Sequence, residues 1–488
     1  MYIMFFMKYN QLRILFSCGI IFLVMISVCS FSCKGREGDL SKNDPWDEMQ
    51  NIIDSIGETS FPDKIYNVVD YGVLADTVFD NTKFFKAAIT HCSKNGGGKV
   101  LVPKGKYYTG PIHLEDNVNL HLEDGAEILF STNPEDYYPL VHTSFEGTEL
   151  MNYSPLIYAY KKKNIAVTGK GVLNGQAGND NWWPWCGKDT YGWKEGMQTQ
   201  HDSLNRPMLV EMAEKGIAVK ERVFGRGHYL RPSFLEPFEC ENVLIKGIKI
   251  INAPFWIIHP IKSSHVIVDG VTVESHGPNN DGCDPEYSKN VLIKNCTFNT
   301  GDDCIAIKSG RNADGRRVAI KSENIIVQNC KMIDGHGGVV MGSEISAGVR
   351  NVYVENCKMD SPNLDRAIRI KTNSKRGGVV ENVYVRNIEV GQVKEAVLKV
   401  NMFYGVYGAQ TGNYLPEIKN INLENIKVKN GGKYGILARG YKESPIKNIT
   451  LKNVIIDKVE TDYSIENVEN LKFENTSING KIIENLNN

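Results

Sequence analysis

The sequence lacks a surplus of charge of either sign. Its 488 residues contain 56 Lys and Arg against 57 Asp and Glu, which gives a formal net charge of -1. Binding to nucleic acid or to an anionic membrane surface would call for a marked basic excess, so the composition indicates neither partner. With 42% hydrophobic and 23% charged residues, the chain has an ordinary globular balance and ample length for a large core.

The first 33 residues differ in composition from the rest. Lys8 and Arg13 precede an apolar run from Ile14 to Val28, and the short segment after it ends at Cys33. This order is typical of an export signal. The position of the cysteine resembles that in a bacterial lipoprotein signal, where the cysteine is lipidated and becomes the mature N-terminus. A plain cleaved signal and an uncleaved anchor are the alternatives.

All three interpretations place the body of the protein outside the cytoplasm. The lipoprotein interpretation predicts a protein of the periplasm or outer membrane of a Gram-negative bacterium, in contact with a membrane only through the lipid at Cys33. Residues 34–60, which begin with the polar stretch KGREGDLSKNDPWDE, would form a linker, and residues 61–488 would form the folded catalytic domain.

The body contains eight cysteines, an even number that suggests disulfides in an exported protein. Three of them recur at the same place in a repeated motif, which points instead to buried core positions. These three are Cys296, Cys330 and Cys357, and the others are Cys92, Cys186, Cys240, Cys283 and Cys304. The sequence alone does not assign a pairing.

Patterns of helical period are scarce along the body, whereas one alternating motif recurs many times. It reads NVLIKG at Asn242, NVLIKNC at Asn290, NIIVQNC at Asn324 and NVYVENC at Asn351, with further copies up to NLKFENT at Asn470. Short strands at such a spacing are what a coil of parallel β-rungs requires. Separate α/β domains would need helices between the strands, and most connections are too short or too rich in Gly and Asn. The sequence therefore predicts an all-β fold, a parallel β-helix.

In such a coil, equal positions of the repeat stack on one another. The asparagines that close the motif would form a ladder of side-chain amides. They are Asn295, Asn329, Asn356, Asn387, Asn425, Asn453 and Asn475. The open N-terminal end of the coil needs a cover because an exposed edge invites aggregation. An amphipathic helix, predicted over Asp80–Cys92, suits that role as an N-terminal helix cap.

Four polar clusters fall on consecutive coils between Ser275 and Asn373, and stacking brings them into one patch. They are Asp281 and Asp284 in GPNNDGCD, Asp302 and Asp303 in NTGDDC, His336 in DGHGG, and Arg369 and Lys371 in RIKT. Crowded carboxylates cannot all ionise freely, so one of them can keep its proton and act as an acid. Singly, each feature is more often a turn or a solvated face, and their coincidence on consecutive coils is what indicates a site.

Local geometry supports the same patch. Gly301 permits a bend that would let the paired aspartates Asp302 and Asp303 share a pocket. Arg369 and Lys371 are two residues apart on a strand-like segment, so they face the same side and could clamp a substrate carboxylate.

The ordered set Asn-Asn-Asp, Gly-Asp-Asp-Cys, Gly-His-Gly and Arg-Ile-Lys resembles the polygalacturonases of glycoside hydrolase family 28, with Asn280 in place of the usual threonine. The likeness extends from YNVVDYGVLADTVFDNTK, near the start of the body, to about Lys371. It implies a right-handed parallel β-helix that hydrolyses α-1,4-linked galacturonate in pectic polysaccharide or oligogalacturonides, with inversion of the anomeric centre.

Carried over to the matching positions, the resemblance implies Asp302 as the general acid that protonates the glycosidic oxygen. Asp281 and Asp303 would activate water from the opposite side. Inversion calls for an acid and a base roughly 6.5 to 9.5 Å apart, to leave room for that water. His336 would tune the protonation of Asp302 or help to hold the substrate.

The resemblance also implies the binding residues. Arg369 and Lys371 would bind the uronate carboxylate, which makes an acidic sugar the expected substrate, and Tyr404 is a candidate for the aromatic residue near the same subsite. Neither a metal nor another cofactor is implied, and we expect a monomer.

The segments SHGPNNDGCDPEYSKN and CIAIKSGRNADGRR look like the bacterial, exo-acting branch of the family. Exo action should need a loop that closes one end of the groove, and the insert from Gln176 to Pro237 is a candidate. Its tryptophans could stack on sugar faces or pack the insert onto the body: Trp182, Trp183, Trp185 and Trp193. Trp256 and His259 lie one coil before Asp281, where the histidine could line the site and core packing is expected for the tryptophan.

Two rival functions share the fold. A pectate lyase would use Ca²⁺ on clustered carboxylates, and the aspartates alone fit it, whereas the ordered set with Gly-His-Gly favours hydrolysis. A non-catalytic β-helix that binds glycans would have little use for paired carboxylates beside a basic pair. The sequence leaves open the linkage and the sugar accepted, including rhamnogalacturonan or branched galacturonan.

Overall fold

The computed structural model describes residues 44–405, 407 and 411–484. The predicted signal at residues 1–33, with its lipidated Cys33, and the linker up to residue 43 lie outside the described residues. Within the described part, no helix combines the length and the apolar composition that crossing a membrane requires.

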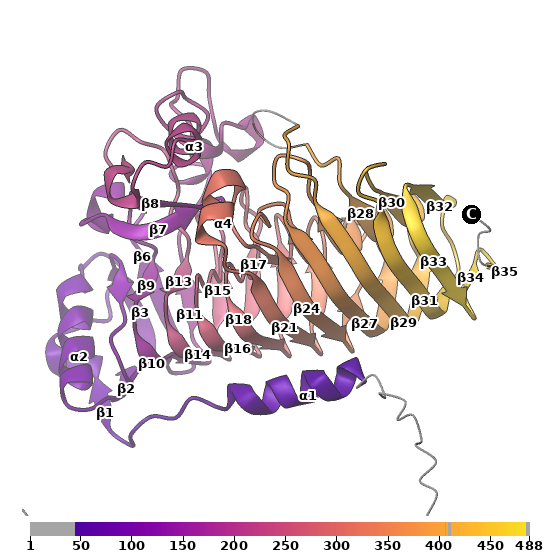
Figure 1. The fold of residues 1–488 in the computed structure, drawn as a ribbon. Coiled ribbons are helices and arrows are strands. Elements are labelled where there is room, and N and C mark those ends of the chain that lie inside the picture. Colours follow the sequence, from indigo (N-terminus) through magenta and orange to yellow (C-terminus); the bar gives the residue numbers. More distant parts are fainter. Residues whose placement is uncertain (1–43, 406, 408–410, 485–488) are drawn as a thin grey trace, which may run out of the picture. The chain divides into compact units, whose positions relative to one another are not determined.

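The recurring motif forms parallel strands that stack in register. The strands β14 (Glu241–Lys246), β16 (Ser264–Asp269), β18 (Lys289–Lys294) and β21 (Ser322–Gln328) pair in this order, and the first apolar residue of each motif aligns with that of the next. Because alternate side chains of a strand point to opposite faces, the aligned residues fill the inside of the coil. The predicted parallel β-helix is confirmed (Figure 1).

The sheet built from these motifs has 23 strands. Its other members are β1 (Ile65–Asn67), β2 (Gly98–Val102), β3 (Gly105–Thr109), β5 (Val118–Leu122), β6 (Ala126–Phe130), β10 (Lys163–Gly169), β11 (Val172–Asn174), β15 (Lys249–Ile251), β17 (Thr272–Ser275), β19 (Thr297–Thr300), β22 (Lys331–Asp334), β24 (Val349–Glu355), β25 (Lys358–Met359), β27 (Val379–Gln392), β29 (Glu417–Asn430), β31 (Ile446–Ile456), β33 (Val468–Glu474), β34 (Ser477–Ile478) and β35 (Lys481–Ile482).

A second row of parallel strands, called the cleft sheet below, carries the candidate site. Its six-stranded part consists of β20 (Ile305–Ile307), β23 (Val339–Gly342), β26 (Arg366–Lys371), β28 (Ala396–Asn401), β30 (Tyr434–Arg439) and β32 (Thr461–Glu466). Single bridges at Cys283 and Ile258 continue the row toward the N-terminus. There it joins β13 (Leu235–Phe238), β9 (Ile157–Tyr160) and β4 (Ile112–His113).

Asparagine side chains form two ladders along the coil. The predicted ladder at the closing position of the motif is present from Asn356 to Asn475, with amide bonds of 2.8 to 3.2 Å between rungs. Nearer the N-terminus, Asn295 instead donates to Asp269 over 2.8 Å. A second ladder, which the sequence did not predict, follows the opening position of the motif. Its members are Asn290, Asn324, Asn351, Asn382, Asn420, Asn448 and Asn470.

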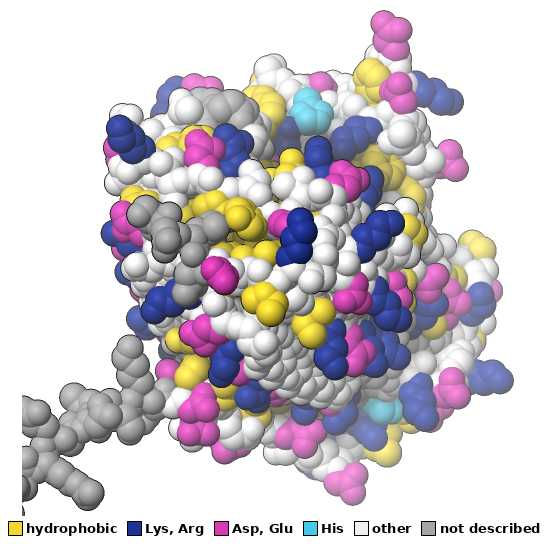
Figure 2. All heavy atoms as spheres, turned by 90° about the vertical axis from the view of Figure 1, so that its right-hand side faces the viewer, with side chains coloured by type: hydrophobic (Ala, Val, Ile, Leu, Met, Phe, Trp, Pro, Cys, Tyr) yellow, Lys and Arg dark blue, Asp and Glu magenta, His cyan; other side chains and the backbone are white. Residues whose placement is uncertain are grey.

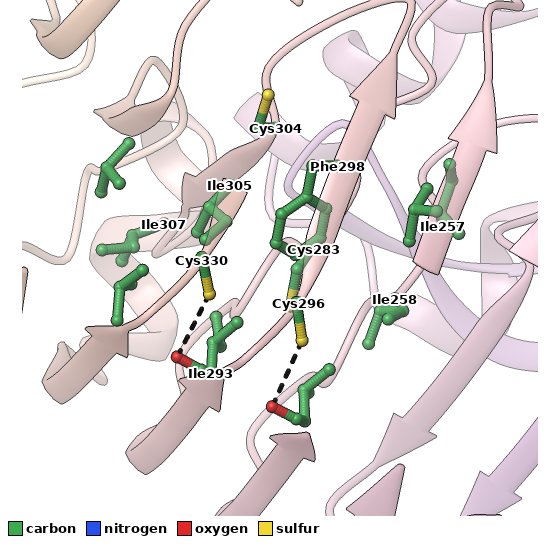
Figure 3. Close-up of a cluster of buried hydrophobic side chains, with 14 of the residues drawn as sticks. Ile257, Ile258, Cys283, Ile293, Cys296, Phe298, Cys304, Ile305, Ile307 and Cys330 are labelled. Atoms are coloured by element: carbon green, nitrogen blue, oxygen red, sulfur yellow. Dashed lines mark hydrogen bonds between the residues drawn. The ribbon is translucent and has the colours of Figure 1, made fainter. Parts of the chain in front are cut away.

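The cysteines of the body are all free and buried, so the disulfides suggested by their even number are absent. The prediction of core positions is confirmed: Cys296 and Cys330 point into the coil on successive rungs beside Phe298 (Figure 3). Their thiols donate to the carbonyls of Val268 and Ile293 on the neighbouring rung. Each cysteine therefore acts as a small apolar residue with a weak hydrogen bond.

Two helices cover parts of the coil that would otherwise be exposed. The predicted N-terminal cap is α2 (Thr82–Lys94), which buries Phe85, Ala88, Ile89 and Cys92. The other, α1 (Pro45–Ile56), lies in the segment predicted as a linker and packs along the outside of the 23-stranded sheet (Figure 1). The second half of residues 34–60 is therefore part of the folded body rather than a tether.

Two segments without the repeat stand over the cleft sheet (Figure 1). The first is an antiparallel hairpin of β7 (Val141–Phe145) and β8 (Thr148–Asn152), extended by β12 (Val223–Phe224). The second is the insert that follows β11, which contains α3 (Arg206–Glu214), and α4 (Asn312–Val318) stands beside both. Short 3-10 turns occur at η1 (Val68–Tyr71), η2 (Pro134–Tyr137), η3 (Trp183–Cys186), η4 (Asp189–Tyr191) and η5 (Val219–Glu221).

On the face at the C-terminal end of the coil, cationic and anionic side chains are interspersed (Figure 2). Such a mixed surface fits the near-zero net charge and gives no single-sign field on this face that a nucleic acid would need.

Candidate active site

The coil brings the predicted acidic residues into one cluster. Asp281 precedes the bridge at Cys283, and Asp302 and Asp303 lie between β19 and β20 on the next coil. The closest oxygens of these three carboxylates all lie within 4.8 Å of one another.

Gly301 is needed for the space that its missing side chain leaves, rather than for a special backbone conformation. Its φ is not in the left-handed region, and a Cβ on it would meet the Gly277 carbonyl oxygen at 2.5 Å and the His276 carbonyl carbon at 2.8 Å. The bend before Asp302 therefore depends on the close approach of two backbones, which a side chain would prevent.

Asp303 is completely buried and held by the predicted basic pair. Lys371 Nζ donates to its Oδ2 over 2.6 Å and Arg369 to its Oδ1 over 3.4 Å. Both cations project from β26 on the same side, as predicted. The two contacts fix the orientation of the Asp303 side chain.

Asp302 forms an ion pair with His336. The distance from His336 Nδ1 to Asp302 Oδ1 is 2.9 Å, and the backbone N–H of His336 donates to the Asp302 carbonyl. Burial alone would raise the pKa of Asp302, but the hydrogen bond and charge of His336, with the charges of Lys371 and Lys308, hold it well below its usual value. The bond to Asp302 raises the pKa of His336 to about 9.

Asp281 is the aspartate whose environment favours the neutral form. Its side chain is 4% exposed, and its nearest cation is Lys308, with Nζ 3.5 Å from Oδ2. Burial and the charge of Asp302 raise the pKa of Asp281 to about 7 against the opposing effect of Lys308. The neighbouring Asp284, also buried, has its pKa raised by burial and by Asp281.

Lys308 was missed by sequence reasoning although it follows the paired aspartates in CIAIKSG. Its ammonium group is 2% exposed, lies 3.4 Å from Glu344 and 3.8 Å from Asp284, and faces the ring of Trp256 at 4.6 Å. The only signal in the sequence was its position in the repeat, which the strand pairing aligns with that of Lys371 two coils further on. It supplies the charge that offsets Asp281.

Tyr404 lies where the resemblance places it. The guanidinium of Arg369 and the ammonium of Lys371 are each 5.3 Å from the centre of its ring. Its backbone is fixed by hydrogen bonds with Thr372 and Asn373. The ring therefore borders the basic pair from the next coil.

The predicted site residues other than Asp303 line a cleft with a cavity volume of about 440 Å³. Asp303 is buried behind this lining. Further lining residues are Asn279, Lys308, Arg311, Glu344, Asp365 and Arg376. A cavity of this size suits a ligand of one or a few sugar units.

The hairpin of β7 and β8 borders the cleft with its tip. Its tip carries Glu146, which pairs with Arg206 at 2.9 Å and Arg311 at 2.7 Å and lines the cavity together with Lys188. We call this end, formed by Glu146, Lys188, Arg206 and Arg311, the blind end.

Beyond the blind end, the floor of the cleft sheet is covered by the hairpin. Glu236, His259 and Glu286 project from successive coils there, and all three are fully buried. Thr143 and Ser144 of the hairpin donate to the two glutamates over 2.8 and 3.1 Å, and His259 lies 2.9 Å from Glu286. His259 therefore belongs to this buried network and does not line the cavity.

The tryptophans of the insert pack it onto the body. Trp182 is fully buried, Trp183 donates to the Ala253 carbonyl, and Trp185 packs against Trp182 and Tyr229. None of the four lines the cavity, whose residues from the insert are Lys188 and Arg206. Trp256 is 3% exposed in a core cluster, as expected, and also borders the cavity.

The three clustered carboxylates offer oxygen ligands of the kind that Ca²⁺ prefers. Two ammonium groups already face them, Lys371 on Asp303 and Lys308 on Asp281. A divalent cation would meet fixed positive charge at short range, so these residues suit a metal poorly.

The comparisons with known proteins show the family of the chain. The model of glycosyl hydrolases family 28 matches residues 225–477. An exopolygalacturonase of known structure from Thermotoga maritima is 45% identical, with a TM-score of 0.85 over 90% of this chain and 98% of that one. The chain belongs to glycosyl hydrolases family 28.

Two curated relatives of this family 28 chain are more distant. The exo-poly-α-D-galacturonosidase of Dickeya chrysanthemi is 26% identical over 392 residues, which are 75% of this chain and 62% of that protein. A probable polygalacturonase of Vitis vinifera is 27% identical over 407 residues, 80% of this chain and 74% of that protein. The family match spans every site residue named above from Asp281 to Tyr404.

Proposed function

We propose that this family 28 chain is an exo-acting polygalacturonase, which hydrolyses α-1,4-linked galacturonate at one end of a pectic polysaccharide or oligogalacturonide. The observation that carries the proposal is the cluster of three aspartates beside a basic pair, at a cleft that Asp281 and Asp302 line. The names of the Thermotoga and Dickeya relatives, both exo-acting on galacturonate polymers, support it.

The blind end supports exo action. The ion pairs of Glu146 with Arg206 and Arg311 would block the path of a chain at this part of the cavity. The rest of the substrate would then extend away from the blind end. Cleavage over Asp302 would release one short product of fixed length from each chain.

In the proposed reaction, Asp302 gives its proton to the glycosidic oxygen as the bond from that oxygen to the anomeric carbon breaks. A water molecule attacks the anomeric carbon and passes a proton to Asp281 or Asp303. Lys371 and Arg369 hold the Asp303 side chain in a fixed orientation. Arg369 and Lys371, with Tyr404 beside them, would bind the uronate carboxylate.

The stereochemical outcome is a separate test of the proposed reaction. We expect inversion, with the β anomer of the new reducing sugar formed first from an α-linked substrate. Proton NMR recorded during the first minutes of turnover measures this anomer. An initial α anomer would indicate a retaining reaction with a covalent intermediate.

The assay that tests the function uses the chain from residue 34 onward with oligogalacturonides in excess EDTA. We expect new reducing ends, no ultraviolet absorbance from unsaturated sugar, and a single short product from the start. Reaction only after Ca²⁺ is restored, with unsaturated products, would establish a lyase instead. Products of mixed length from the start would establish endo action.

Replacing the acid tests its role. Asp302→Asn should lower kcat by about 10² to 10⁴-fold because general acid catalysis is lost. The matched control is Asp360→Asn, which removes an equal charge from an exposed position. Normal turnover in the Asp302 variant would overturn the assignment, and unchanged thermal unfolding would show that the fold is intact.

We also propose that the protein is exported, lipid-anchored at Cys33 in the periplasm or outer membrane of a Gram-negative bacterium, and monomeric. The order of charged residues, apolar run and cysteine in residues 1–33 supports this location. Expression of the full chain with a labelled fatty acid should label the protein, and Cys33→Ala should abolish the label. A label that survives this change would exclude the anchor, and light scattering of the body would measure its mass in solution.

A further inference from the structure

The cleft sheet continues past the basic pair toward the C-terminus. In the pairing of β26 with β28, Arg369 aligns with Lys399 and Lys371 aligns with Asn401. In the pairing of β28 with β30, Asn401 aligns with Arg439. Because aligned residues of parallel strands project to the same face, Lys399 and Arg439 extend the two rows that carry the basic pair.

Several cations lie close together in this stretch of the sheet. Lys399 and Arg366 share Glu395 as a partner, and Arg366 also pairs with Asp365. Burial, followed by the charges of Arg366 and Arg369, lowers the pKa of Lys399 to about 8. The Nε atoms of Arg366 and Arg369 are buried without a hydrogen-bond partner among the described residues. A bound anion would offset the positive charge around Lys399 and would accept hydrogen bonds from these Nε atoms.

An aromatic face borders the same place. The ring of Phe403 is 40% exposed and packs against Tyr441, with 4.4 Å between ring centres. The guanidinium of Arg439 lies 5.0 Å from the centre of the Phe403 ring. Arg439 is 44% exposed, and its pair with Glu466 is an exposed one of small stability, so it can exchange partners.

On the basis of the proposed function, we infer that Lys399, Arg439 and Phe403 form a further subsite, which binds a second uronate of the leaving part of the chain. With the blind end closed to a longer chain, as proposed above, this stretch of the cleft sheet is a path for the rest of the substrate. The cations bind the carboxylate, and the exposed ring packs against the sugar face. Neighbouring rungs lie about 4.8 Å apart, so the subsite is one to two rungs beyond the basic pair.

The test compares substrates of different length. Digalacturonate fills the blind end and the basic pair, whereas trigalacturonate reaches the new subsite. In Lys399→Met and Arg439→Met, we expect kcat/KM for trigalacturonate and longer chains to fall about tenfold, since each variant loses a charged hydrogen bond. The value for digalacturonate should stay within twofold of the unaltered protein. The control is Lys452→Met, which removes an exposed lysine from β31, outside the cleft sheet.

Two outcomes would overturn the subsite. Equal losses on digalacturonate and trigalacturonate would show an effect on the basic pair or the fold, and unchanged values on both would show that these cations do not bind substrate.

Binding to an inactive chain separates this inference from the proposed function. In the Asp302→Asn background, calorimetry should give tighter binding of trigalacturonate than of digalacturonate, and Lys399→Met should remove the difference. Equal binding of the two lengths would overturn the subsite. No binding of either would overturn the proposed function as well.

Discussion

The three aspartates differ in how their charge is stabilised, although they lie together. Asp303 has two cations, Asp302 has a histidine, and Asp281 has only the more distant Lys308. The resemblance makes Asp302 the acid, yet His336 helps to hold the pKa of Asp302 low, whereas burial raises the pKa of Asp281 and of the neighbouring Asp284. We therefore treat the proton as shared by the cluster, and a bound substrate must draw it to Asp302.

This sharing predicts the pH dependence of turnover. The proton on the cluster is present below the Asp281 pKa of about 7 and is lost above it. The kcat/KM should therefore be highest in mildly acidic solution and fall about tenfold for each pH unit above that value. A rate that rises from pH 7 to 9 would contradict a shared proton. Initial rates on digalacturonate at constant ionic strength measure the profile.

The raised pKa of Asp281 predicts that replacing this residue stabilises the fold, although the variant is inactive. The pKa of Asp281 is about 7 in the folded state, above the value near 3.9 of an unfolded chain. Between these values the folded state binds more protons, so stability falls as pH rises, and the full cost of the buried charge is present above pH 7. Asp281→Asn should thus have a higher Tm than the unaltered protein at pH 8.

At pH 4 the advantage of Asp281→Asn should largely vanish, because both chains then carry a neutral side chain at this position. Thermal unfolding at the two pH values measures the difference. Asp360→Asn, at an exposed position, is the control and should show no such dependence.

Among the elements, the asparagine ladders turn a sequence repeat into a fixed register. Each ladder residue has a left-handed backbone, with φ of 55° at Asn387, and its amide bonds the rungs on both sides. Asparagine tolerates this conformation better than other residues with a side chain. The left-handed backbone and the hydrogen bonds between rungs therefore both favour asparagine at this position.

Two substitutions at Asn387 separate the contribution of the hydrogen bonds from that of the left-handed backbone. Asn387→Ala loses both amide bonds and places a Cβ in the left-handed region, so we expect a loss of about 2 to 3 kcal/mol in the free energy of unfolding. Asn387→Gly loses the bonds but tolerates the backbone, and it should cost about 1 kcal/mol less. Urea unfolding measures both. Equal losses would show that the backbone conformation carries no cost.

The elements that could be predicted are those whose signal is local. The repeat gave the coil, the closing asparagines gave one ladder from Asn356 onward, and the helix cap appeared as a local amphipathic pattern. The hairpin of β7 and β8 was missed because its hydrogen bonds run to Glu236 and Glu286, which lie 93 and 142 residues from their partners. Lys308 was missed for a similar reason: its role depends on residues of other coils.

At the scale of the whole molecule, α1 explains why part of the repeat carries apolar residues on the outside of the coil, which a β-helix alone does not need. The central residue of the motif faces outward, yet on six consecutive coils it is apolar and buried. These residues, the outer stripe, are Ala166, Leu244, Ile267, Leu292, Ile326 and Tyr353. Beyond Tyr384 the aligned positions become polar, beginning with Asn422. The outer stripe thus matches the part of the coil that α1 covers.

Removing α1 should therefore weaken the whole coil. A chain that starts at residue 60 loses the burial of Met49, Ile52 and Ile56 and the contact of Trp46 with Tyr353. Each buried aliphatic side chain contributes about 1.5 to 3 kcal/mol, and ordering the helix offsets part of this. We expect a loss of at least about 2 kcal/mol against a chain that starts at Asp44, measured by urea unfolding, and stronger binding of a hydrophobic dye.

A point variant tests the same contact without truncation. Ile52→Asp places a charge against the outer stripe and should destabilise the longer chain about as much as removing the helix, whereas Asn51→Asp, one residue earlier on the exposed face, should not. Turnover of digalacturonate should survive in both, because none of the residues lining the cleft comes from α1. The two chains that start at Asp44 and at residue 60 and the two point variants could instead prove equally stable. This result would show that α1 adds no stability to the coil. Residues 44–60 would then act as the linker that their polar composition predicts.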